Sequence, residues 1–400
     1  MFEDMLHIME RQSGETFSET GSARSLWMNE WSKLVLRAFD PERKVVYVSA
    51  YAFPLEILAA FDVVPFDFEL ASGMIGTTKM GVPSMLESED RGYSPDVCSF
   101  HRIALGAFYL NHFPKPDLLL TTSFYCDGKT KTNEILSILH QKEAMLLQVP
   151  AEINGEAIRY VEQQLRQIAA GIATTVGQPF DEDKLKEAVR SSNRARRSQQ
   201  KMLELLKHRP APWGGSQLIS FSINALWFTG SEVKERLNGE FVREMERAIQ
   251  ADEDRPERHR IYWFAWIPTY PSNLFDVLSE HHVSVPLCET FRISWDEIDE
   301  ENPFEGLALK CLKNPFVGPG ARRTEDLETI AEDYAIDGAM LFATPACRHS
   351  KSTNRILRDQ MMKLGIPFLT LDMDISDPRG HSQERTSARL EEFVEILDQR

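Results

Sequence analysis

Two parts of the chain alternate short apolar runs with helical patterns. In the first part, about residues 40–150, the apolar runs are 44–50, 63–67, 117–123 and 144–150, with helical patterns at 54–61, 97–112 and 131–141. In the second part, about residues 258–400, the runs are 260–268, 283–286, 338–344 and 367–374, and a last helix is expected over 383–398. Continuous apolar runs between helices are typical of parallel sheets covered by helices on both faces. We therefore predict an α/β protein with two open parallel sheets.

The middle of the chain has a different pattern. Residues 153–208 and 215–250 show a period of 3.6 and many charges, which predicts long helices separated by a loop at 209–215. The predicted organisation is a sequence of four parts: an N-terminal helical segment (1–42), a first α/β domain (43–152), a helical connector (153–257) and a second α/β domain (258–400).

Composition narrows the class of protein. The 400 residues include 45 Lys and Arg against 61 Asp and Glu, a net charge of −16, which argues against a nucleic-acid binder. The hydrophobic share of 42% and the charged share of 26% are typical of a soluble globular protein. No apolar run approaches the roughly 18 residues of a membrane span, and the acidic N-terminus does not resemble a signal peptide. We expect a cytoplasmic protein without a membrane partner.

Five cysteines are too few for a disulfide framework, so metal binding, catalysis or core packing remain. Cys126 and Cys347 each follow a predicted strand and precede a helix, and Cys98 opens a helical pattern. Ligands of open parallel sheets bind beyond the carboxyl ends of strands, and helix N-termini favour a thiolate. Cys288 and Cys311 are expected to be inert core residues.

The spacing of the three candidate thiols leaves their role open. They are separated by 28 and 221 residues and form no C-x-x-C pair, which argues against a zinc ribbon. Three unrelated thiols, a zinc site and an iron–sulfur cluster all remain. If they share one site, two ligands come from the first α/β unit and one from the second, so the site lies between them.

Several separated segments resemble one known family, the 2-hydroxyacyl-CoA dehydratases and ATP-dependent benzoyl-CoA reductases. These segments are 49–66, with SAYAFPLEILAAFDVVPF; 96–108, with DVCSFHRIALGAF; 125–136, with YCDGKTKTNEIL; and 346–397, which begins ACRHSKSTNRIL. The last segment also contains the family's Leu-Asp-x-Asp motif, its Asp-Pro-Arg motif and its Gln or Glu followed by Arg-Thr, here at 371–374, 377–379 and 384–386. The resemblance covers most of 45–150 and 258–397. Tyr125 and Phe124 depart from the smaller residues expected beside the second cysteine.

The resemblance implies a fold and an activity. It implies two flavodoxin-like domains with a [4Fe–4S] cluster between them, held by Cys98, Cys126 and Cys347, so that one iron lacks a protein ligand. It further implies a 2-hydroxyacyl-CoA dehydratase subunit, an enzyme that reduces the thioester by one electron to a ketyl radical and then loses water. The expected partners are an acyl-CoA substrate, a homologous second subunit forming a heterodimer, and an ATP-hydrolysing iron–sulfur activator. The chain has no G-x-x-x-x-G-K-[ST] motif, so ATP hydrolysis is assigned to that activator.

Other functions within the same family remain open. One is a subunit of an ATP-dependent benzoyl-CoA reductase, an oxidoreductase. Another is a double-cubane-type reductase, which five cysteines make less natural. A third is a non-catalytic electron-transfer or scaffold subunit whose partner holds the substrate. An oxygen-sensitive enzyme of an anaerobic cytoplasm is expected in each case.

Three polar residues are candidates for catalysis. Ser49 and Glu56 flank the first strand-to-helix turn and are expected to face substrate, although a strand-end hydroxyl and a helix N-terminal acid are their plain structural alternatives. His101 follows Cys98 by one turn and is expected to donate a proton or to hydrogen-bond a cluster sulfide, with a structural histidine as the alternative.

Further charged residues are candidates for supporting roles. Arg348 and His349, beside Cys347, are expected to stabilise the charge of the reduced cluster or the substrate carbonyl, with ordinary helix-surface residues as the alternative. Arg322 and Arg323 are weaker candidates for the phosphates of coenzyme A. Asp372 and Asp374 end a predicted strand and are expected to be structural.

Overall fold

Two four-stranded parallel sheets form the framework of the chain, as predicted. The computed structural model describes residues 2–49, 51, 53–251, 256–293 and 297–400. The first sheet has the order β2-β1-β3-β4, with β1 (Lys44–Val48), β2 (Val63–Asp67), β3 (Leu118–Thr122) and β4 (Ala144–Leu147). The second has the order β6-β5-β7-β8, with β5 (His259–Ala265), β6 (Val283–Cys288), β7 (Gly338–Ala343) and β8 (Phe368–Asp372). Both orders follow the 2-1-3-4 arrangement of flavodoxin-like folds, which confirms the predicted class. Residue 50, the last of the predicted strand 44–50, lies outside the described residues.

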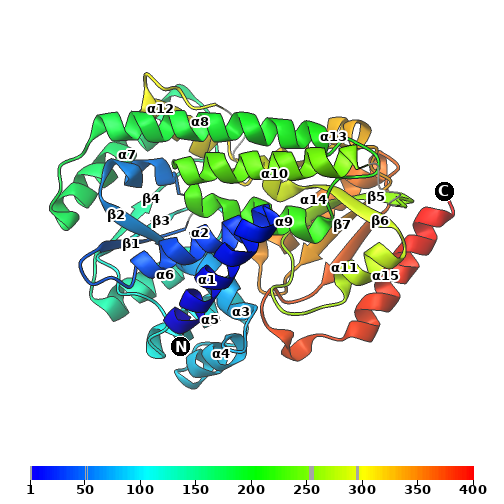
Figure 1. The fold of residues 1–400 in the computed structure, drawn as a ribbon, viewed down its shortest axis with the longest axis horizontal. Helices are drawn as coiled ribbons and strands as arrows, with labels where there is room; N and C mark the ends of the chain where they lie inside the picture. The colour runs from blue at the N-terminus through cyan, green and yellow to red at the C-terminus, as the bar shows by residue number, and fades with distance from the viewer. Residues whose placement is uncertain (1, 50, 52, 252–255, 294–296) are drawn as a thin grey trace.

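Helices cover both sheets. In the N-terminal part these are α1 (Phe2–Thr20), α2 (Ala23–Arg37), the 3₁₀ helix η1 (Leu55–Ala60), α3 (Phe68–Gly76), α4 (Gly81–Asp90), α5 (Ser99–Tyr109) and α6 (Asp127–His140). The middle contains α7 (Gly155–Val176), α8 (Glu182–Leu205), α9 (Gly215–Asn224), η2 (Ala225–Phe228) and α10 (Glu232–Gln250). The C-terminal part contains α11 (Leu274–Glu280), η3 (Glu289–Ile293), α12 (Pro303–Leu312), η4 (Gly320–Thr324), α13 (Leu327–Asp333), α14 (Arg348–Lys363), η5 (Pro378–Gly380) and α15 (Gln383–Asp398). Figure 1 shows α8 and α10 side by side, spanning the width of both sheets.

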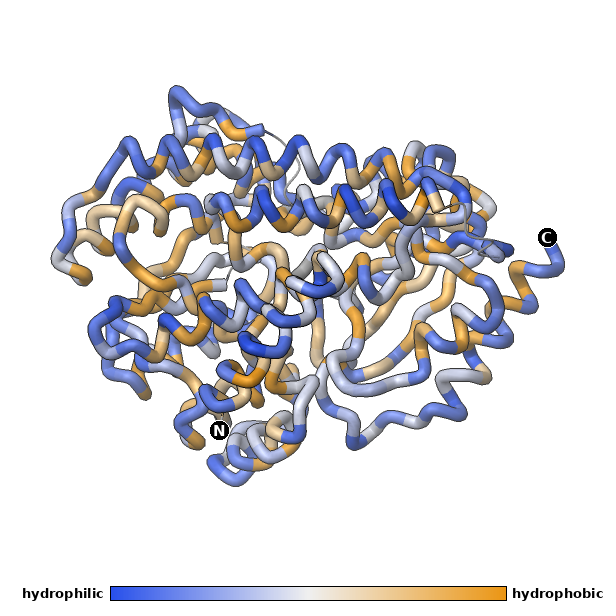
Figure 2. The backbone as a smooth tube through the Cα atoms, viewed as in Figure 1, coloured by the Kyte–Doolittle hydropathy of each residue, from blue (hydrophilic) through white to orange (hydrophobic). Residues whose placement is uncertain are grey.

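The apolar runs form the buried strands. Every residue of β3 and of β7 is buried, as expected for parallel strands with helices on both faces. The hydropathy colouring follows the same division, with apolar strands inside and polar residues along α8 and α10 (Figure 2). Among the described residues, no helix is long and apolar enough to cross a membrane.

Glycines account for two departures from the predicted helices. The pattern over 153–208 breaks into α7 and α8, because α7 ends at Gly177, whose positive φ of 70° suits glycine. The second difference is α3, which, like α4, the hydrophobic pattern does not predict. In α3, a Cβ on Gly76 would lie 2.6 Å from Thr269 Oγ1 of the second domain, so glycine permits a close contact between the domains.

A network of ion pairs joins the two domains. Arg102 of α5 donates to Glu89 at 2.5 Å and to Asp377, in the loop before η5, at 3.0 Å. Arg379 contacts the same two carboxylates, each at 2.6 Å. We call Glu89, Arg102, Asp377 and Arg379 the interdomain network. Burial raises the pKa of Asp377, but hydrogen bonds from Arg379 and Arg102 outweigh it and lower that pKa to about 2.

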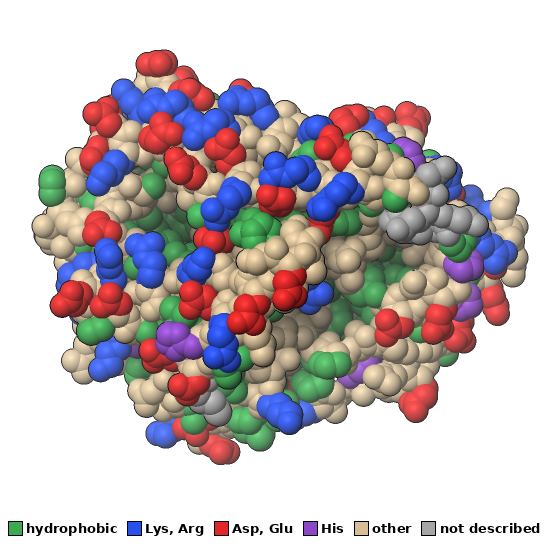
Figure 3. All heavy atoms as spheres, viewed as in Figure 1, with side chains coloured by type: hydrophobic (Ala, Val, Ile, Leu, Met, Phe, Trp, Pro, Cys, Tyr) green, Lys and Arg blue, Asp and Glu red, His purple; other side chains and the backbone are tan. Residues whose placement is uncertain are grey.

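Charges are otherwise dispersed over the surface. Figure 3 shows basic and acidic side chains interspersed on one face, including the region of α8 and α10. Many of these charges pair within a helix, as Arg166 does with Glu162 at 2.8 Å. Exposed pairs of this kind contribute little to stability, so we interpret them as a solvated surface.

Candidate functional site

Residues from the carboxyl ends of both sheets line one cavity. Its volume is about 50 Å³. On the same measure one water molecule needs about 10–15 Å³, so the cavity has room for several atoms. We call it the cysteine cavity. Its walls are formed by Tyr51, Asp67, Glu69, Leu70, Cys98, Phe100, His101, Tyr125, Cys126, Trp266, Thr344, Cys347 and Ile375. These residues lie at or after the ends of β1, β2, β3, β5, β7 and β8, or at the start of α5, so the carboxyl edges of the two sheets face each other here.

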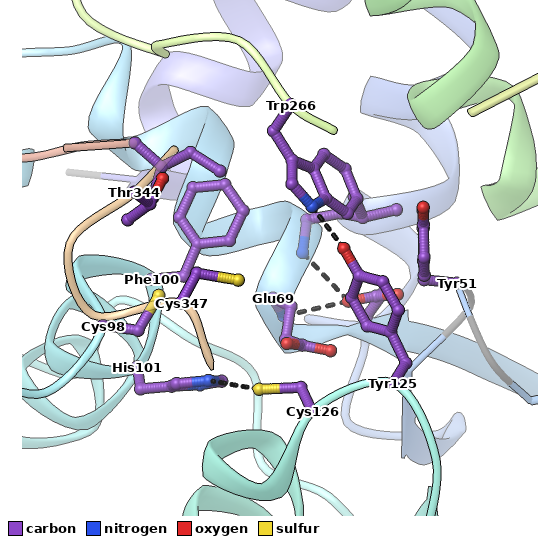
Figure 4. A pocket seen from close by; sticks show the side chains of 13 residues that line it. Tyr51, Glu69, Cys98, Phe100, His101, Tyr125, Cys126, Trp266, Thr344 and Cys347 are labelled. Atoms are coloured by element: carbon purple, nitrogen blue, oxygen red, sulfur yellow. Dashed lines mark hydrogen bonds between the residues drawn. The ribbon is translucent and has the colours of Figure 1, made fainter. Parts of the chain in front are cut away.

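The three cysteines selected from the sequence meet in this cavity. Cys98, Cys126 and Cys347 are the N-cap residues of α5, α6 and α14, and Figure 4 shows their sulfur atoms turned into the same space. Cys126 Sγ accepts a hydrogen bond from the Lys129 backbone N–H at 3.4 Å. The other two cysteines, Cys288 and Cys311, are buried elsewhere in the core, as expected.

The cavity disfavours free thiolates. Burial, followed by repulsion from Cys126 and Cys347, raises the pKa of Cys98 well above its usual value. Burial and the nearby Glu69 raise the pKa of Cys126 to about 12. Thiolates at Cys98 and Cys126 therefore need a cationic group to stabilise them.

The arrangement fits a cluster better than a single ion. Among the described residues, no three His, Cys, Asp or Glu side chains converge closely enough to hold one metal ion. The three sulfur atoms instead surround a space for several atoms, and an iron–sulfur cluster takes thiolates on separate irons around its own volume. Cys98, Cys126 and Cys347 are the residues that would hold it.

Polar groups with acid–base chemistry also face the cavity. Glu69 lies in the first turn of α3, and Ser49 Oγ donates to Glu69 Oε2 at 2.7 Å. His101 is buried with Nε2 3.6 Å from Cys126 Sγ, and its Nδ1 has no hydrogen-bond partner among the described residues. Burial lowers the pKa of His101, so its imidazole is neutral near pH 7. Of the predicted residues, His101 thus lines the cavity, while Ser49 does not line it and contacts it only through Glu69, which the sequence reasoning missed.

The Cys-Asp-Gly-Lys motif holds the second cysteine in place. Lys129 is fully buried and donates through Nζ to Thr122 Oγ1 at 2.7 Å and to Phe124 O at 3.0 Å, so it fixes the loop between β3 and α6. A Cβ on Gly128 would lie 3.1 Å from the His101 ring, so glycine lets α6 approach α5 closely. The glycine and the lysine of the motif therefore each have a packing reason.

An aromatic wall closes another side of the cavity. The rings of Tyr51 and Tyr125 are 4.4 Å apart, those of Tyr51 and Trp266 are 4.6 Å apart, and Trp266 Nε1 donates to the Tyr125 hydroxyl. Tyr125 has a φ of 78°, a left-handed conformation that is strained for a bulky residue. The departure noted beside Cys126 is therefore part of the cavity wall. Tyr51 follows the predicted strand 44–50, so the strand-end rule applied to the cysteines would have found it, whereas Trp266 lies inside the predicted run 260–268 and follows a strand, β5, only in the structure.

Other predicted residues lie outside the lining of the cavity. Glu56 is buried against the helical layer, where its Oε1 accepts from Ser192 Oγ at 2.8 Å and from Lys310 Nζ at 2.5 Å. Arg348 is at the surface, with a side chain 89% exposed, and lies 3.7 Å from Asp127. This ion pair links the starts of α6 and α14, the helices that Cys126 and Cys347 cap. Arg348 therefore lies near these two cysteines but does not line their cavity.

The remaining candidates are bound to protein groups. Arg323 is buried against Glu289 at 2.6 Å, and Arg322 donates to the carbonyls of Leu312 and Ala151. The His349 ring packs 4.6 Å from Tyr125, and burial lowers its pKa to about 4. Neither arginine is free to bind a phosphate in this arrangement.

Known proteins of one family match nearly the whole chain. The model of the family described as 2-hydroxyglutaryl-CoA dehydratase, D-component, matches residues 50–397. A benzoyl-CoA reductase subunit of Thauera aromatica is 26% identical over 380 residues, covering 86% of this chain and 87% of that protein. The alpha subunit of (R)-2-hydroxyglutaryl-CoA dehydratase from Acidaminococcus fermentans is 23% identical, covering 71% of this chain and 61% of its own length. The alpha subunit of lactoyl-CoA dehydratase from Anaerotignum propionicum is also 23% identical, covering 89% and 91%.

These relatives are enzyme subunits of two kinds, dehydratases and a reductase. The residues matched by the family model include the three cavity cysteines and every strand except β1. The segments that carried the resemblance supply most of the cavity lining, but not Glu69 or Trp266. The chain belongs to the 2-hydroxyglutaryl-CoA dehydratase D-component family and is an enzyme subunit of the dehydratase or benzoyl-CoA reductase type.

Proposed function

We propose that this chain is the subunit that holds a [4Fe–4S] cluster in a 2-hydroxyacyl-CoA dehydratase. The observation that carries the proposal is the meeting of Cys98 and Cys126 of the first domain with Cys347 of the second in one buried cavity. When bound, the cluster would supply low-potential single electrons, which are needed because the C3 proton of the substrate is not acidic. The family match and the named relatives support this assignment.

The cavity's own side chains supply the proton chemistry in this proposal. Dehydration removes the 2-hydroxyl group and one C3 proton as water, so one group must accept a proton and another must assist the leaving hydroxyl. Glu69 is the proposed proton acceptor, and Ser49 orients its carboxylate through the 2.7 Å hydrogen bond. His101, with a neutral imidazole, is proposed to donate a hydrogen bond from its ring N–H to the 2-hydroxyl group, and the proton that Glu69 takes from C3 completes the water that leaves.

A second candidate is favoured by the aromatic wall. Tyr51, Tyr125 and Trp266 present ring faces and edges to the cavity, which suits a planar aromatic acyl group. One of the relatives is a benzoyl-CoA reductase subunit. The alternative proposal is therefore a subunit of an ATP-dependent aromatic acyl-CoA reductase with the same cluster ligands. Substrate assays separate the two proposals.

The proposed partners follow from the same assignment. The relatives are named as subunits, so we propose a homologous second subunit forming a heterodimer. An ATP-hydrolysing iron–sulfur protein is proposed as the electron donor. The proposed cluster would be oxygen-sensitive, so we propose that the enzyme works in an anaerobic cytoplasm.

Iron and acid-labile sulfide content tests the cluster assignment. We expect about four irons per chain after anaerobic reconstitution, a sharp loss in Cys347→Ser, and no loss in the matched control Cys311→Ser, whose thiol is buried outside the cavity. About eight irons would favour the double-cubane alternative. Absence of iron from the reconstituted wild type would refute the ligand set.

Turnover tests the proton chemistry separately. With the second subunit and an electron donor, we expect Glu69→Gln to lower kcat on a 2-hydroxyacyl-CoA by 100-fold or more, as is typical of a lost general base, roughly 10²–10⁴-fold. The iron content should stay at the wild-type value. Glu56→Gln is the control, because Glu56 is a buried carboxylate that does not line the cavity. Equal losses in both variants would contradict the assignment of Glu69.

A further inference from the structure

A second and much larger cavity adjoins the cysteine cavity. Its volume is about 570 Å³, within the range of about 300–1,000 Å³ typical of small-molecule sites. We call it the C-terminal cavity, because most of its wall comes from β8, the loop after it and the first turns of α15. It is lined by Pro95, Arg102, Tyr270, Pro345, Thr370, Leu371, Asp372, Met373, Asp374, Asp377, Gly380, His381, Arg385, Thr386 and Arg389.

The two cavities share their dividing wall. Thr344 and Ile375 line the cysteine cavity, while the adjacent Pro345 and Asp374 line the C-terminal cavity. The wall therefore consists of two chain segments at the carboxyl ends of β7 and β8. This edge of an open parallel sheet is where such folds bind ligands.

The acidic residues of the C-terminal cavity are already compensated. Asp372 pairs with Lys351 at 2.6 Å, and Asp377 belongs to the interdomain network. Asp374 accepts from Ser99 Oγ at 2.5 Å and from the backbone N–H of Ser376 at 2.9 Å. Each of these carboxylates already has a protein partner, which agrees with the structural role expected for Asp372 and Asp374, so they do not offer a site for a cation.

Two of the basic side chains in this wall, those of Arg385 and Arg389, make far weaker contacts with protein groups. Arg385 and Arg389 are one turn apart on α15 and so lie on the same face of the helix. Arg385 Nη2 makes a long hydrogen bond of 3.4 Å to Gly380 O, and Arg389 lies 4.0 Å from an exposed glutamate, Glu392. Their guanidinium groups therefore keep most of their hydrogen-bonding capacity for a ligand.

Two further polar side chains in the wall each have an atom that could form another hydrogen bond. Tyr270 is 5% exposed, and its hydroxyl has no hydrogen-bond partner among the described residues. The same holds for His381 Nε2, whose ring lies 5.4 Å from that of Tyr270. A buried polar group without a partner costs free energy, so a bound molecule that supplied one would be favoured.

We propose that the C-terminal cavity binds a phosphate-bearing nucleotide through Arg385 and Arg389. The planar guanidinium fork matches a phosphate group, and the start of α15 adds the positive end of a helix dipole. Leu371, Met373 and Pro345 provide apolar surface for a base. The nucleotide is either the end of a coenzyme A thioester whose acyl end reaches the cysteine cavity, or a free nucleotide. The first source rests on the proposed function and the second does not.

Calorimetric binding to the full chain tests this inference without turnover. The titrants are coenzyme A, adenosine 3′,5′-bisphosphate and ADP. Wild type is compared with the double variant Arg385→Gln/Arg389→Gln and with Arg358→Gln, an exposed arginine of α14 that does not line the cavity. We expect at least a tenfold weaker Kd in the double variant and no change in Arg358→Gln. Tyr270→Phe should weaken binding two- to fivefold and serves as a second variant.

The outcomes separate the two ligand sources and the two proposals. Tighter binding of coenzyme A and adenosine 3′,5′-bisphosphate than of ADP assigns the cavity to the substrate, and the reverse order assigns it to a free nucleotide. Equal Kd values for wild type, the double variant and Tyr270→Phe, with thermal stability retained, would overturn the inference. The iron content of the double variant should equal that of wild type. A chain that binds no iron yet loses nucleotide affinity in the double variant would refute the cluster proposal alone.

Discussion

Arg102 offers a demanding test of the contact between the domains. Its side chain is 2% exposed and its guanidinium bridges Glu89 of α4 and Asp377 of the C-terminal segment, which are 19% and 12% exposed. Replacing it by methionine keeps apolar volume but leaves two largely buried carboxylates facing Arg379 alone. Breaking a buried pair costs about 3–5 kcal/mol, and we take about 3 kcal/mol because Arg379 remains. With an unfolding entropy of about 2.1 cal/mol/K per residue over 400 residues, Tm should fall by about 3–4 °C.

The comparison with Arg379 isolates the effect of burial. Arg379 contacts the same two carboxylates at 2.6 Å, but its side chain is 36% exposed, so Arg379→Met should cost about 1 kcal/mol or less. Arg91→Met, which breaks the exposed i,i+4 pair with Glu87 on α4, should cost below about 0.5 kcal/mol. Calorimetry or thermal circular dichroism measures all three. A loss in Arg102→Met no larger than in Arg379→Met would refute the burial argument.

The remaining predictions concern pH and glycine. The pKa of Asp377 is depressed to about 2 in the folded chain, so its stabilisation is complete above its unfolded pKa of about 4 and disappears as the pH falls toward 2. The Tm difference between wild type and Asp377→Asn should therefore be constant from pH 7 to 5 and shrink below pH 4, and a difference that shrinks at neutral pH would contradict this. Gly106→Ala should destabilise by more than about 3 kcal/mol, since its Cβ would lie 1.7 Å from Ser84 O. Gly239→Ala, whose Cβ would meet no atom within 4 Å on α10, should raise stability by about 0.5–1 kcal/mol in the same denaturation assay. A stabilising Gly106→Ala or a destabilising Gly239→Ala would contradict this account of the helix packing.

The pattern of the sequence predicts the sheets because each strand is a continuous apolar run. The strand-end rule then places Cys126 and Cys347 correctly, since it depends on local order along the chain and not on contacts. It extends to Tyr51, which a rule restricted to cysteines passes over, but not to Trp266, which the sequence pattern places inside a strand. These parts of the site can therefore be predicted from short stretches of sequence.

Other parts depend on contacts between distant segments. Helix α3 contains Gly73 and Gly76, which lower helix propensity locally but allow close packing against Phe100 and Thr269. Glu69 belongs to this helix, so the same weak local signal hides it. The pairing of Arg102 with Asp377 joins positions 275 residues apart, which periodicity cannot reveal.

The positions of the three cavity cysteines along the chain bear on how the protein is made. Cys98 and Cys126 emerge from the ribosome early, but Cys347 follows 221 residues later. At about 5–20 residues per second, that interval is roughly 10–40 s, during which the first domain exposes an incomplete thiol set. Under the proposed ligand set, cluster insertion has to wait until the last quarter of the chain is synthesised and docked. Iron delivery then becomes a step after translation, and a truncated chain ending before β7 is expected to be released without its cofactor.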